Sequence, residues 1–431
     1  MKILLVYPQY PDTFWSFKHA LEIMGKKAAM PPLGLLTIAS MLERGNELKL
    51  IDMNVNPITD ENILWADYVF ISAMITQKDS TEEVIRRCKD LNTKIVAGGP
   101  LFSHLHEKFP DVSHFILNEG EITIPLFLED LKNGNPKKIY ISDIRPDINL
   151  APVPKWDLIN LEDYARMALQ FSRGCPFDCE FCDIVNLNGR VPRVKSVEQF
   201  MKELNSLYDC GWRSSIFIVD DNFMGNLAQV KLLLKELIKW RKQKHYRWSF
   251  MTQISINFAS DDELLLLMKK AGFSTVFIGI ETPSKTSLEE CGKFHNKNRD
   301  MVKDVKKIYN YGMDIYGGFI IGFDNDDETI FNTQFEFIQE TGIVVAMMGL
   351  LTALPGTKLY KRLKDENRLI KESGGNNIDF DINFIPKMKK RILISGYKDL
   401  LIKLYSVENY YDRIFNFLKE YASPQEGTLK D

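Results

Sequence analysis

Apolar and polar positions alternate along the first 133 residues as they do in strands that are followed by amphipathic helices. Short apolar runs separated by stretches with helical spacing predict a parallel sheet covered by helices. In open parallel sheets, ligands bind outside the carboxyl ends of the strands, so these ends are the first candidates for a site. The predicted strands are Lys2–Tyr7, Leu48–Asp52, Tyr68–Ser72, Lys94–Ala97 and His114–Leu117, and the predicted helices are Leu33–Arg44, Thr81–Leu91 and Ile122–Lys132.

A linker is predicted at residues 134–164, where few apolar positions are periodic. Its prolines are Pro136, Pro146, Pro152 and Pro154. Because proline restricts itself and its predecessor to extended conformations, this segment is predicted to connect two domains as a strap.

The second block, residues 165–365, alternates strands and helices again. Six βα units fit an open or partial (β/α)6 barrel, and a second doubly wound sheet is the alternative that spacing alone leaves open. The predicted strands are Met167–Ser172, Ser215–Val219, Ser249–Ile254, Thr275–Ile280, Ile315–Ile321 and Val345–Ala353. The predicted helices are Val197–Tyr208, Leu227–Trp240, Asp261–Ala271, Asp300–Tyr311 and Glu328–Thr341.

Residues 366–431 form a predicted C-terminal helical segment, with helices over Ile392–Leu404 and Glu408–Tyr421. A frayed tail is expected from Ser423 to Gly427, where serine, proline and glycine replace the periodic apolar positions. The segment is rich in tyrosine and phenylalanine, which suits a lid over an apolar substrate. An aromatic stripe that packs on the barrel is the competing interpretation.

Composition narrows the function classes. The 431 residues carry 55 basic and 58 acidic side chains, a net charge of −3, which argues against a dedicated nucleic-acid binder. The N-terminus has no signal-peptide layout, and the longest nearly apolar run, Ile343 to Leu354, is too short for a membrane span of about 20 residues. Six cysteines in a chain this long do not form a secreted disulfide scaffold, so a reducing cytoplasm is the expected location.

Three of the cysteines, Cys175, Cys179 and Cys182, are crowded into eight positions. Thiolates favour iron–sulfur clusters, zinc or copper. A structural zinc site requires four ligands, whereas the remaining cysteines, Cys88, Cys210 and Cys291, are scattered along the sequence. A cubane cluster held by three cysteines leaves one iron open for a chelating molecule. A zinc knuckle completed from a distant part of the chain, and three unrelated buried thiols, are the alternatives.

The C-x3-C-x2-C spacing, followed by a barrel-like βα series, resembles the radical S-adenosylmethionine (SAM) superfamily. The resemblance implies a 4Fe-4S cluster whose open iron binds the amino and carboxyl groups of SAM. Reductive cleavage of SAM then gives a 5′-deoxyadenosyl radical, and the electron comes from an external donor of the flavodoxin or ferredoxin type. Barrel packing is the competing explanation for each of the implied SAM residues, which are Phe181, Asp220, Asp221, Gln253, Glu281, Gly318 and Ile320.

The N-terminal domain is similar to the Rossmann-like cobalamin-binding domain that precedes many radical SAM enzymes; ordinary turns of such a sheet are the alternative. The sequence lacks the Asp-x-His-x-x-Gly motif that places histidine on cobalt, so the resemblance implies a cobalt whose lower face has no protein ligand. The implied cobalamin residues are Tyr7, Pro8, Ser72, Ala73, Met74, Ile75, Gly98, Gly99, Pro100, Leu101, Glu119, Gly120 and Glu121.

Across nearly its whole length the chain resembles cobalamin-binding radical SAM proteins with an extra C-terminal helical domain, a group that includes hopanoid methylases. This resemblance implies C-methylation of an unactivated carbon, in a small-molecule or lipid-like substrate, through the 5′-deoxyadenosyl radical and methylcobalamin. The first domain's strand ends would then face the barrel mouth. A non-methylating cyclisation or rearrangement is the alternative reaction, and a non-catalytic cobalamin or redox sensor is a more remote one.

Overall fold

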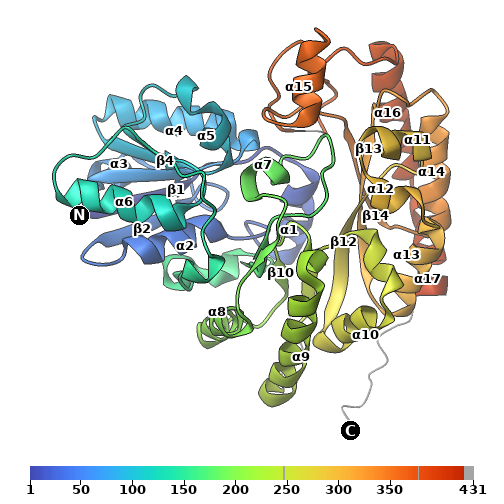
Figure 1. Ribbon diagram of the computed structural model, residues 1–431, viewed down its shortest axis with the longest axis horizontal. Coiled ribbons are helices and arrows are strands. Elements are labelled where there is room, and N and C mark those ends of the chain that lie inside the picture. Colours follow the sequence, from blue (N-terminus) through green and yellow to red (C-terminus); the bar gives the residue numbers. More distant parts are fainter. Residues whose placement is uncertain (246–247, 377, 422–431) are drawn as a thin grey trace. The chain divides into compact units, whose positions relative to one another are not determined.

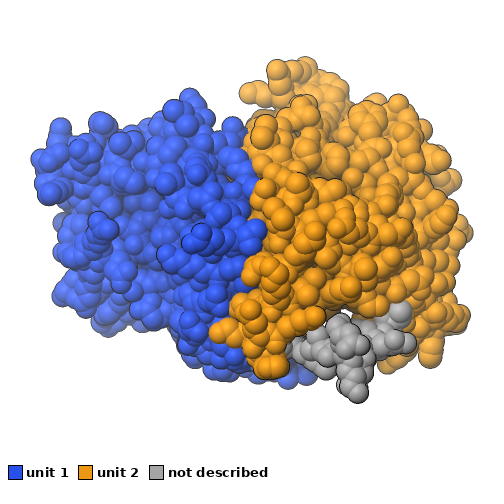
Figure 2. All heavy atoms as spheres, turned by 60° about the horizontal axis from the view of Figure 1, so that its bottom comes forward, with its two compact units in different colours: residues 1–169, 193–215, 374–376 blue, residues 170–192, 216–373, 377–431 orange. Residues whose placement is uncertain are grey.

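The computed structural model describes residues 1–245, 248–376 and 378–421, and it divides into two compact units. Figure 2 shows unit 1 in blue and unit 2 in orange. Unit 1 comprises residues 1–169, 193–215 and 374–376, and unit 2 comprises the remainder of the described chain. Each unit is built around parallel strands, as Figure 1 shows.

Unit 1 contains a six-stranded parallel sheet in the order β2-β1-β3-β4-β5-β6. The inner strand β1 is apolar on both faces: Leu4 and Leu5, which point in opposite directions, are both fully buried. Such strands read as continuous apolar runs because helices cover both sides of a parallel sheet. The strands are β1 (Lys2–Tyr7), β2 (Glu47–Asp52), β3 (Tyr68–Ser72), β4 (Lys94–Gly98), β5 (His114–Ile116) and β6 (Ile139–Tyr140).

Helices α2 (Leu33–Leu42) and α6 (Gly120–Lys132) pack on one face of this sheet, where Leu35 and Phe127 join the same apolar cluster as Leu5 and Phe70. In Figure 1 helices α4 and α5 lie on the opposite side of the strands. The other helices of unit 1 are α1 (Lys18–Met24), α3 (Asp60–Trp65), α4 (Lys78–Asp90), α5 (Pro100–Leu105) and α8 (Val197–Asp209).

The strand order places β1 between β2 and β3, so the direction of the chain through the sheet reverses at β1. Helices that leave neighbouring strands at such a switch point go to opposite faces, which opens a crevice beyond the carboxyl ends of the strands. In unit 1 this crevice lies beyond Tyr7 of β1 and Ser72 of β3.

Five strands of unit 2 lie parallel in the order β14-β13-β12-β11-β10. They are β10 (Ile216–Ile218), β11 (Phe250–Gln253), β12 (Phe273–Glu281), β13 (Asp314–Ile321) and β14 (Val345–Leu350). The helices of this part are α7 (Ile184–Asn188), α9 (Leu227–Lys244), α10 (Asp262–Ala271), α11 (Lys285–Glu290), α12 (Phe294–Lys297), α13 (Met301–Asn310) and α14 (Ile330–Thr341).

Every predicted strand overlaps an observed one, and the strand ends agree within two residues except at two places, where the observed strand ends three residues early. The predicted strand Met167–Ser172 is split into β7 (Met167–Leu169) and β8 (Ser172–Arg173), because the Phe171 amide donates to the Asp220 carboxylate instead of to a neighbouring strand. Strand β14 stops at Leu350 rather than Ala353, whose amide donates to the Asn383 side chain. Side-chain acceptors thus replace strand pairing at these two places.

The C-terminal segment contains α15 (Lys358–Asp365), α16 (Lys390–Leu404) and α17 (Val407–Glu420). The Tyr397 and Tyr405 hydroxyls donate to backbone carbonyls of β14, over 2.9 and 2.7 Å, so these rings pack on the sheet as the competing interpretation expected. The predicted tail, Ser423 to Gly427, lies outside the described residues. No helix among the described residues is long and apolar enough to cross a membrane.

Candidate functional site

The cysteine loop, residues 174–182, follows β8 and precedes α7. It starts at Gly174, whose φ of +100° belongs to the left-handed region. A Cβ atom at this position would lie 2.9 Å from the carbonyl oxygen of Gly189, so only glycine fits without a shift of the backbone. The Cys175 amide donates to the same carbonyl over 3.1 Å. The loop is therefore closed tightly on the segment that follows α7.

The three thiols of the loop fit a metal-containing group. Burial raises the pKa of Cys179 to about 11 and that of Cys182 to about 12, so the bare thiolates are unfavourable without a cation beside them. Lys293 acts in the opposite direction on all three cysteines. Among the described residues, no group of three or more His, Cys, Asp or Glu side chains is placed so that it could hold a single metal ion.

Two carboxylates at the end of β10 fasten this loop. Asp220 is fully buried and accepts from the Phe171 amide over 2.7 Å and from the Ser172 hydroxyl over 2.6 Å. Asp221 accepts from the Gly174 amide over 2.7 Å and from the Asn188 amide group over 2.9 Å. For Asp220 this geometry favours the packing explanation over direct contact with SAM.

The burial of Asp220 is expected to make the stability of unit 2 depend on pH. Burial raises the pKa of Asp220 from 3.8 to about 7, although hydrogen bonds from Ser172 and Phe171 favour the charged form. The folded state therefore binds a proton on Asp220 more tightly than the unfolded state does. The stabilisation that this proton provides is complete below about pH 4 and is lost as the pH rises through about 7. Asp220→Asn mimics the neutral carboxyl group and cannot lose this proton. The difference in unfolding temperature, variant minus wild type, should therefore be larger at pH 8 than at pH 5.

Thermal unfolding at these two pH values checks the prediction. Asp399→Asn, at an exposed position, serves as the control and should keep a constant offset from the wild type. If Asp220→Asn also keeps a constant offset, the buried carboxyl group does not titrate in this range.

Asn222 contacts one of the three cysteines, which the sequence did not predict. The residue is nearly buried, and its side-chain nitrogen lies 3.8 Å from the sulfur of Cys175 and 3.1 Å from the Ser255 hydroxyl. Its side-chain oxygen accepts from the Ser255 amide over 3.3 Å. Asn222 therefore links the cysteine loop to the segment after β11.

Glu281 ends β12 in a left-handed conformation, with a φ of +64° that costs a non-glycine residue energy and is concentrated at functional sites. Its carboxylate forms an ion pair with Lys293, and both side chains are only 10% exposed. The pair lies over Gly279, where a Cβ atom would be 2.4 Å from the Glu281 oxygen and 2.7 Å from the Lys293 nitrogen. A small residue in β12 thus makes room for a buried charge pair.

The other predicted SAM residues lie at the carboxyl ends of neighbouring strands. Gln253 is the last residue of β11, and Gly318 and Ile320 belong to β13. Gln334 of α14 is fully buried and donates to the carbonyls of both Glu281 and Ile320, over 3.0 and 3.1 Å. Phe181 places its ring 6.2 Å from that of Phe323, just beyond β13. The residues that sequence motifs singled out therefore share one edge of the unit 2 strands.

Sequence reasoning missed several residues of this edge. Asn222 belongs to the motif that contains Asp220 and Asp221, but its contact with Cys175 was not predicted, while Lys293 and Gln334 carry no motif of their own. The structure also brings Cys291 close to the loop: its carbonyl accepts from the Glu180 amide over 2.9 Å, and its thiol lies near enough to Cys179 to affect the Cys291 pKa. Cys291 is thus isolated in the sequence but not in space.

In unit 1, Gln77 ties together the two sides of the switch point. The side chain is fully buried; its nitrogen donates to the Pro8 carbonyl after β1, and its oxygen accepts from the Met74 amide after β3 over 2.8 Å. Tyr7 hydrogen-bonds to the same glutamine. Gln77, which was not predicted, therefore fixes the positions of predicted cobalamin residues at the ends of two strands.

The remaining predicted cobalamin residues surround the ends of β3, β4 and β5. The Leu101 amide, at the start of α5, donates to the Ala73 carbonyl over 3.0 Å. Glu119 forms an ion pair of 2.7 Å with Arg193, which also belongs to unit 1. The other members of this set are Ser72, Ile75, Gly98, Gly99 and Pro100, together with Gly120 and Glu121 in the first turn of α6.

A substitution at Gly99 tests whether these strand ends bind cobalamin. The φ of Gly99 is +89°, and a Cβ atom would lie 2.8 Å from the Ser72 hydroxyl and 3.0 Å from the Ala73 carbonyl oxygen. Gly99→Ala should therefore displace the end of β3 and raise the dissociation constant for cobalamin about tenfold, which corresponds to ~1.4 kcal/mol. Titration with hydroxocobalamin, followed by absorbance, measures the constant.

Gly134→Ala is the matched control, because Gly134 has a φ of +75° but nothing lies within 4 Å of its Cβ position. It shares the conformational cost without the steric clash. Equal dissociation constants for the two variants would show that the end of β3 plays no part in binding.

Three family models match the chain: the B12 binding domain over residues 27–128, the radical SAM superfamily over residues 169–334, and a domain of unknown function, DUF4070, over residues 357–430. A Synechocystis protein described as an uncharacterized methyltransferase is 42% identical over 99% of this chain and 80% of its own length. The hopanoid C-2 methylase of Rhodopseudomonas palustris is 34% identical over 94% of this chain and 77% of its own length. The chain belongs to the cobalamin-binding radical SAM family.

A solved structure agrees with this assignment at the level of the fold. The cobalamin-dependent SAM radical enzyme OxsB, with aqua-cobalamin and SAM bound, superposes with a TM-score of 0.71 at 17% identity, over 94% of this chain and 66% of OxsB. Like other members of the family, the protein is a radical SAM enzyme of the methyltransferase type, and its cofactors are a 4Fe-4S cluster, SAM and cobalamin. The predictions of family, fold class and cofactors are thereby confirmed.

Proposed function

We propose that the protein methylates an unactivated carbon of a small, lipid-like molecule. When bound, the cluster with SAM supplies a radical that removes hydrogen from the substrate, and cobalamin supplies the methyl group. The observation that carries the proposal is the common edge of unit 2, where the cysteine loop, the Asn222 side chain and the Glu281–Lys293 pair lie at the carboxyl ends of neighbouring strands.

The residues of this edge would divide the work of holding the cofactors. Cys175, Cys179 and Cys182 would hold the cluster, and Asp221 fixes the start of their loop through the Gly174 amide. Glu281 would accept hydrogen bonds from ribose hydroxyls, for which a carboxylate is suited, while the ion pair with Lys293 orients it. The backbone from Gly318 to Ile320 and the Phe181 ring would enclose the adenine.

Unit 1 would hold cobalamin at its switch point. Gln77 keeps the ends of β1 and β3 at a fixed spacing, and Gly99 allows β4 to approach β3 closely. The absence of an Asp-x-His-x-x-Gly motif favours a cobalt without a protein ligand on its lower face. A cobalt–nitrogen bond from histidine in the spectrum of the bound cofactor would contradict this part of the proposal.

The lipid-like substrate is supported by the relative named hopanoid C-2 methylase, which matches 94% of this chain. We also propose an external one-electron donor of the flavodoxin or ferredoxin type and a reducing cytoplasm, because the thiolates of a cluster loop are readily oxidised. The near-neutral charge offers no basic surplus for a nucleic-acid substrate.

Methyl transfer to separated cell extracts tests the substrate class. Protein reconstituted without air would be incubated with a strong reductant, cobalamin and SAM that carries a deuterated methyl group, together with either a lipid extract or an aqueous extract. We expect deuterium in a molecule of the lipid fraction, detected by mass spectrometry. Deuterium in the aqueous fraction alone would contradict the lipid-like substrate while leaving methylation intact.

A further inference from the structure

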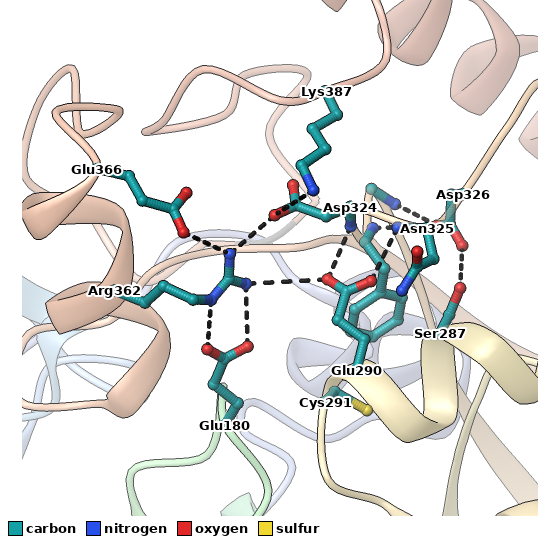
Figure 3. Close-up of polar contacts among 12 residues, drawn as sticks. Glu180, Ser287, Glu290, Cys291, Asp324, Asn325, Asp326, Arg362, Glu366 and Lys387 are labelled. Atoms are coloured by element: carbon teal, nitrogen blue, oxygen red, sulfur yellow. Dashed lines mark hydrogen bonds and ion pairs between the residues drawn. The ribbon is translucent and has the colours of Figure 1, made fainter.

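Arg362 of α15 reaches the cysteine loop from the C-terminal part of the chain. Figure 3 shows its guanidinium group facing Glu180, which lies between Cys179 and Cys182. The Nε and Nη2 atoms lie 2.6 and 3.0 Å from the two oxygens of Glu180. Such a two-pronged contact fixes the orientation of a carboxylate as well as its position.

The same guanidinium group holds the loop that follows β13. Its Nη1 atom lies 2.8 Å from the Oδ2 atom of Asp324, and Arg368 adds a second two-pronged contact to Asp324 over 2.6 and 2.8 Å. The Glu290 carboxylate accepts hydrogen bonds from the backbone amides of Asp324 and Asn325, both over 2.8 Å (Figure 3). Arg362 therefore joins the cysteine loop to the loop after the predicted adenine-contacting strand through charged contacts to both.

The backbone of Glu180 is held in the same place. Its amide donates to the Cys291 carbonyl over 2.9 Å, and its carbonyl accepts from the Leu359 amide of α15 over 2.9 Å. Three contacts thus restrain one residue of the cysteine loop, and two of them come from α15. All of these residues belong to unit 2.

Charge gives this contact a second consequence. The Glu180 side chain is only 17% exposed and that of Asp324 only 7%. The Glu180 carboxylate is poorly hydrated and directly follows Cys179, so it disfavours additional negative charge near the cysteine loop. The guanidinium group of Arg362 reduces this effect because its positive charge lies beside Glu180. In metal sites, residues that contact the ligands without binding the metal likewise set the orientation of the ligands and the redox potential of the metal.

We propose that the C-terminal domain of unknown function completes the cofactor site through Arg362, a positioning residue that aligns the cysteine loop with the loop after β13 and neutralises Glu180. The match to that domain begins at residue 357, directly before α15, so its first helix carries the contact. The inference rests on the proposed function only in that the cysteine loop holds the cluster.

Three variants in the full-length protein test the proposal: Arg362→Gln, Glu180→Gln and the double variant. Reduced cluster is followed by electron paramagnetic resonance, both during a redox titration and during titration with SAM. Arg362→Gln should shift the midpoint potential to lower values, because the negative charge of Glu180 is no longer offset. Glu180→Gln should shift it to higher values, and the double variant should return towards the wild type.

Affinity for SAM should respond differently from the potential. Both single variants lose the two-pronged contact, so both should raise the dissociation constant for SAM about tenfold, which matches the smallest losses of metal affinity or activity found for partners behind metal ligands. Arg362→Lys keeps the charge but not the fork, so it should restore the potential more fully than the affinity. Lys361→Gln, which removes a charge from an exposed position of the same helix, should change neither.

The outcomes separate the two proposals. Potentials that move in the same direction in both single variants, or that stay at the wild-type value, would overturn the positioning role of Arg362. If Arg362→Gln does not fold, the upward shift expected for Glu180→Gln decides the question. Wild-type protein that assembles no cluster would instead overturn the proposed function, irrespective of Arg362.

Discussion

Cys179→Ala is expected to abolish cluster assembly and, with it, all reductive cleavage of SAM. Thiolates supply the bonds to iron, and alanine has no ligand atom with which to replace the middle cysteine of the triplet. Binding of cobalamin should persist, since its predicted residues lie in unit 1. Iron and sulfide content, together with 5′-deoxyadenosine measured after anaerobic reduction, report the two effects separately.

Two other cysteines provide the controls. Cys210 is exposed and lies in unit 1, so Cys210→Ala should leave iron content and SAM cleavage unchanged. Cys291 is the more demanding control, because it is buried near Cys179. Cys291→Ala should still assemble the cluster. Loss of iron in Cys291→Ala would mean that four cysteines hold the metal, and retention of iron in Cys179→Ala would contradict the three-cysteine site.

Lys293→Met is expected to destabilise unit 2 strongly. It would leave the carboxylate of Glu281 without its partner at a site where both side chains are 10% exposed. Removal of one member of a buried ion pair costs about 3–5 kcal/mol, because an uncompensated charge stays buried. The free energy of unfolding from urea titrations should fall by this amount.

A second substitution separates the lost charge from lost packing. Glu281→Gln combined with Lys293→Met removes both charges, so the double variant should be more stable than Lys293→Met alone. Lys307→Met breaks the pair with Asp262, whose side chain is 70% exposed, and should have little effect. If Lys293→Met and the double variant lose the same free energy of unfolding, the unpaired charge is not the cause of the destabilisation.

Much of the fold was predictable because strands buried on both faces read as continuous apolar runs. β1 and β3 were predicted with their observed ends for this reason. Short helices such as α3 were not predicted: six residues are too few for a periodic pattern, and its start depends on the Thr59 side chain, which caps the Asn62 amide. Two strand ends were misplaced by three residues because Asp220 and Asn383, distant in sequence, accept the amides that strand pairing would have used.

The site divides in the same way. Residues within a local motif, such as the three cysteines and Glu281, could be singled out from the sequence alone. Arg362 could not, because its partner Glu180 is 182 positions away and nothing in the sequence marks the pair. Lys293 and Gln334 act through contacts that only the folded strands create. Sequence motifs identify ligands, whereas the side chains that orient them become visible only in three dimensions.

The central claim is that the protein uses SAM both as a methyl donor and as a radical source. The most direct measurement is the yield of S-adenosylhomocysteine and 5′-deoxyadenosine from protein reconstituted without air with cluster, cobalamin, SAM, reductant and lipid extract. The account predicts that both products accumulate over repeated turnovers. Cys179→Ala should give no 5′-deoxyadenosine and no more S-adenosylhomocysteine than a single methylation of the bound cobalamin can produce. Formation of 5′-deoxyadenosine without S-adenosylhomocysteine in the wild type would contradict methyl transfer and leave a non-methylating radical reaction.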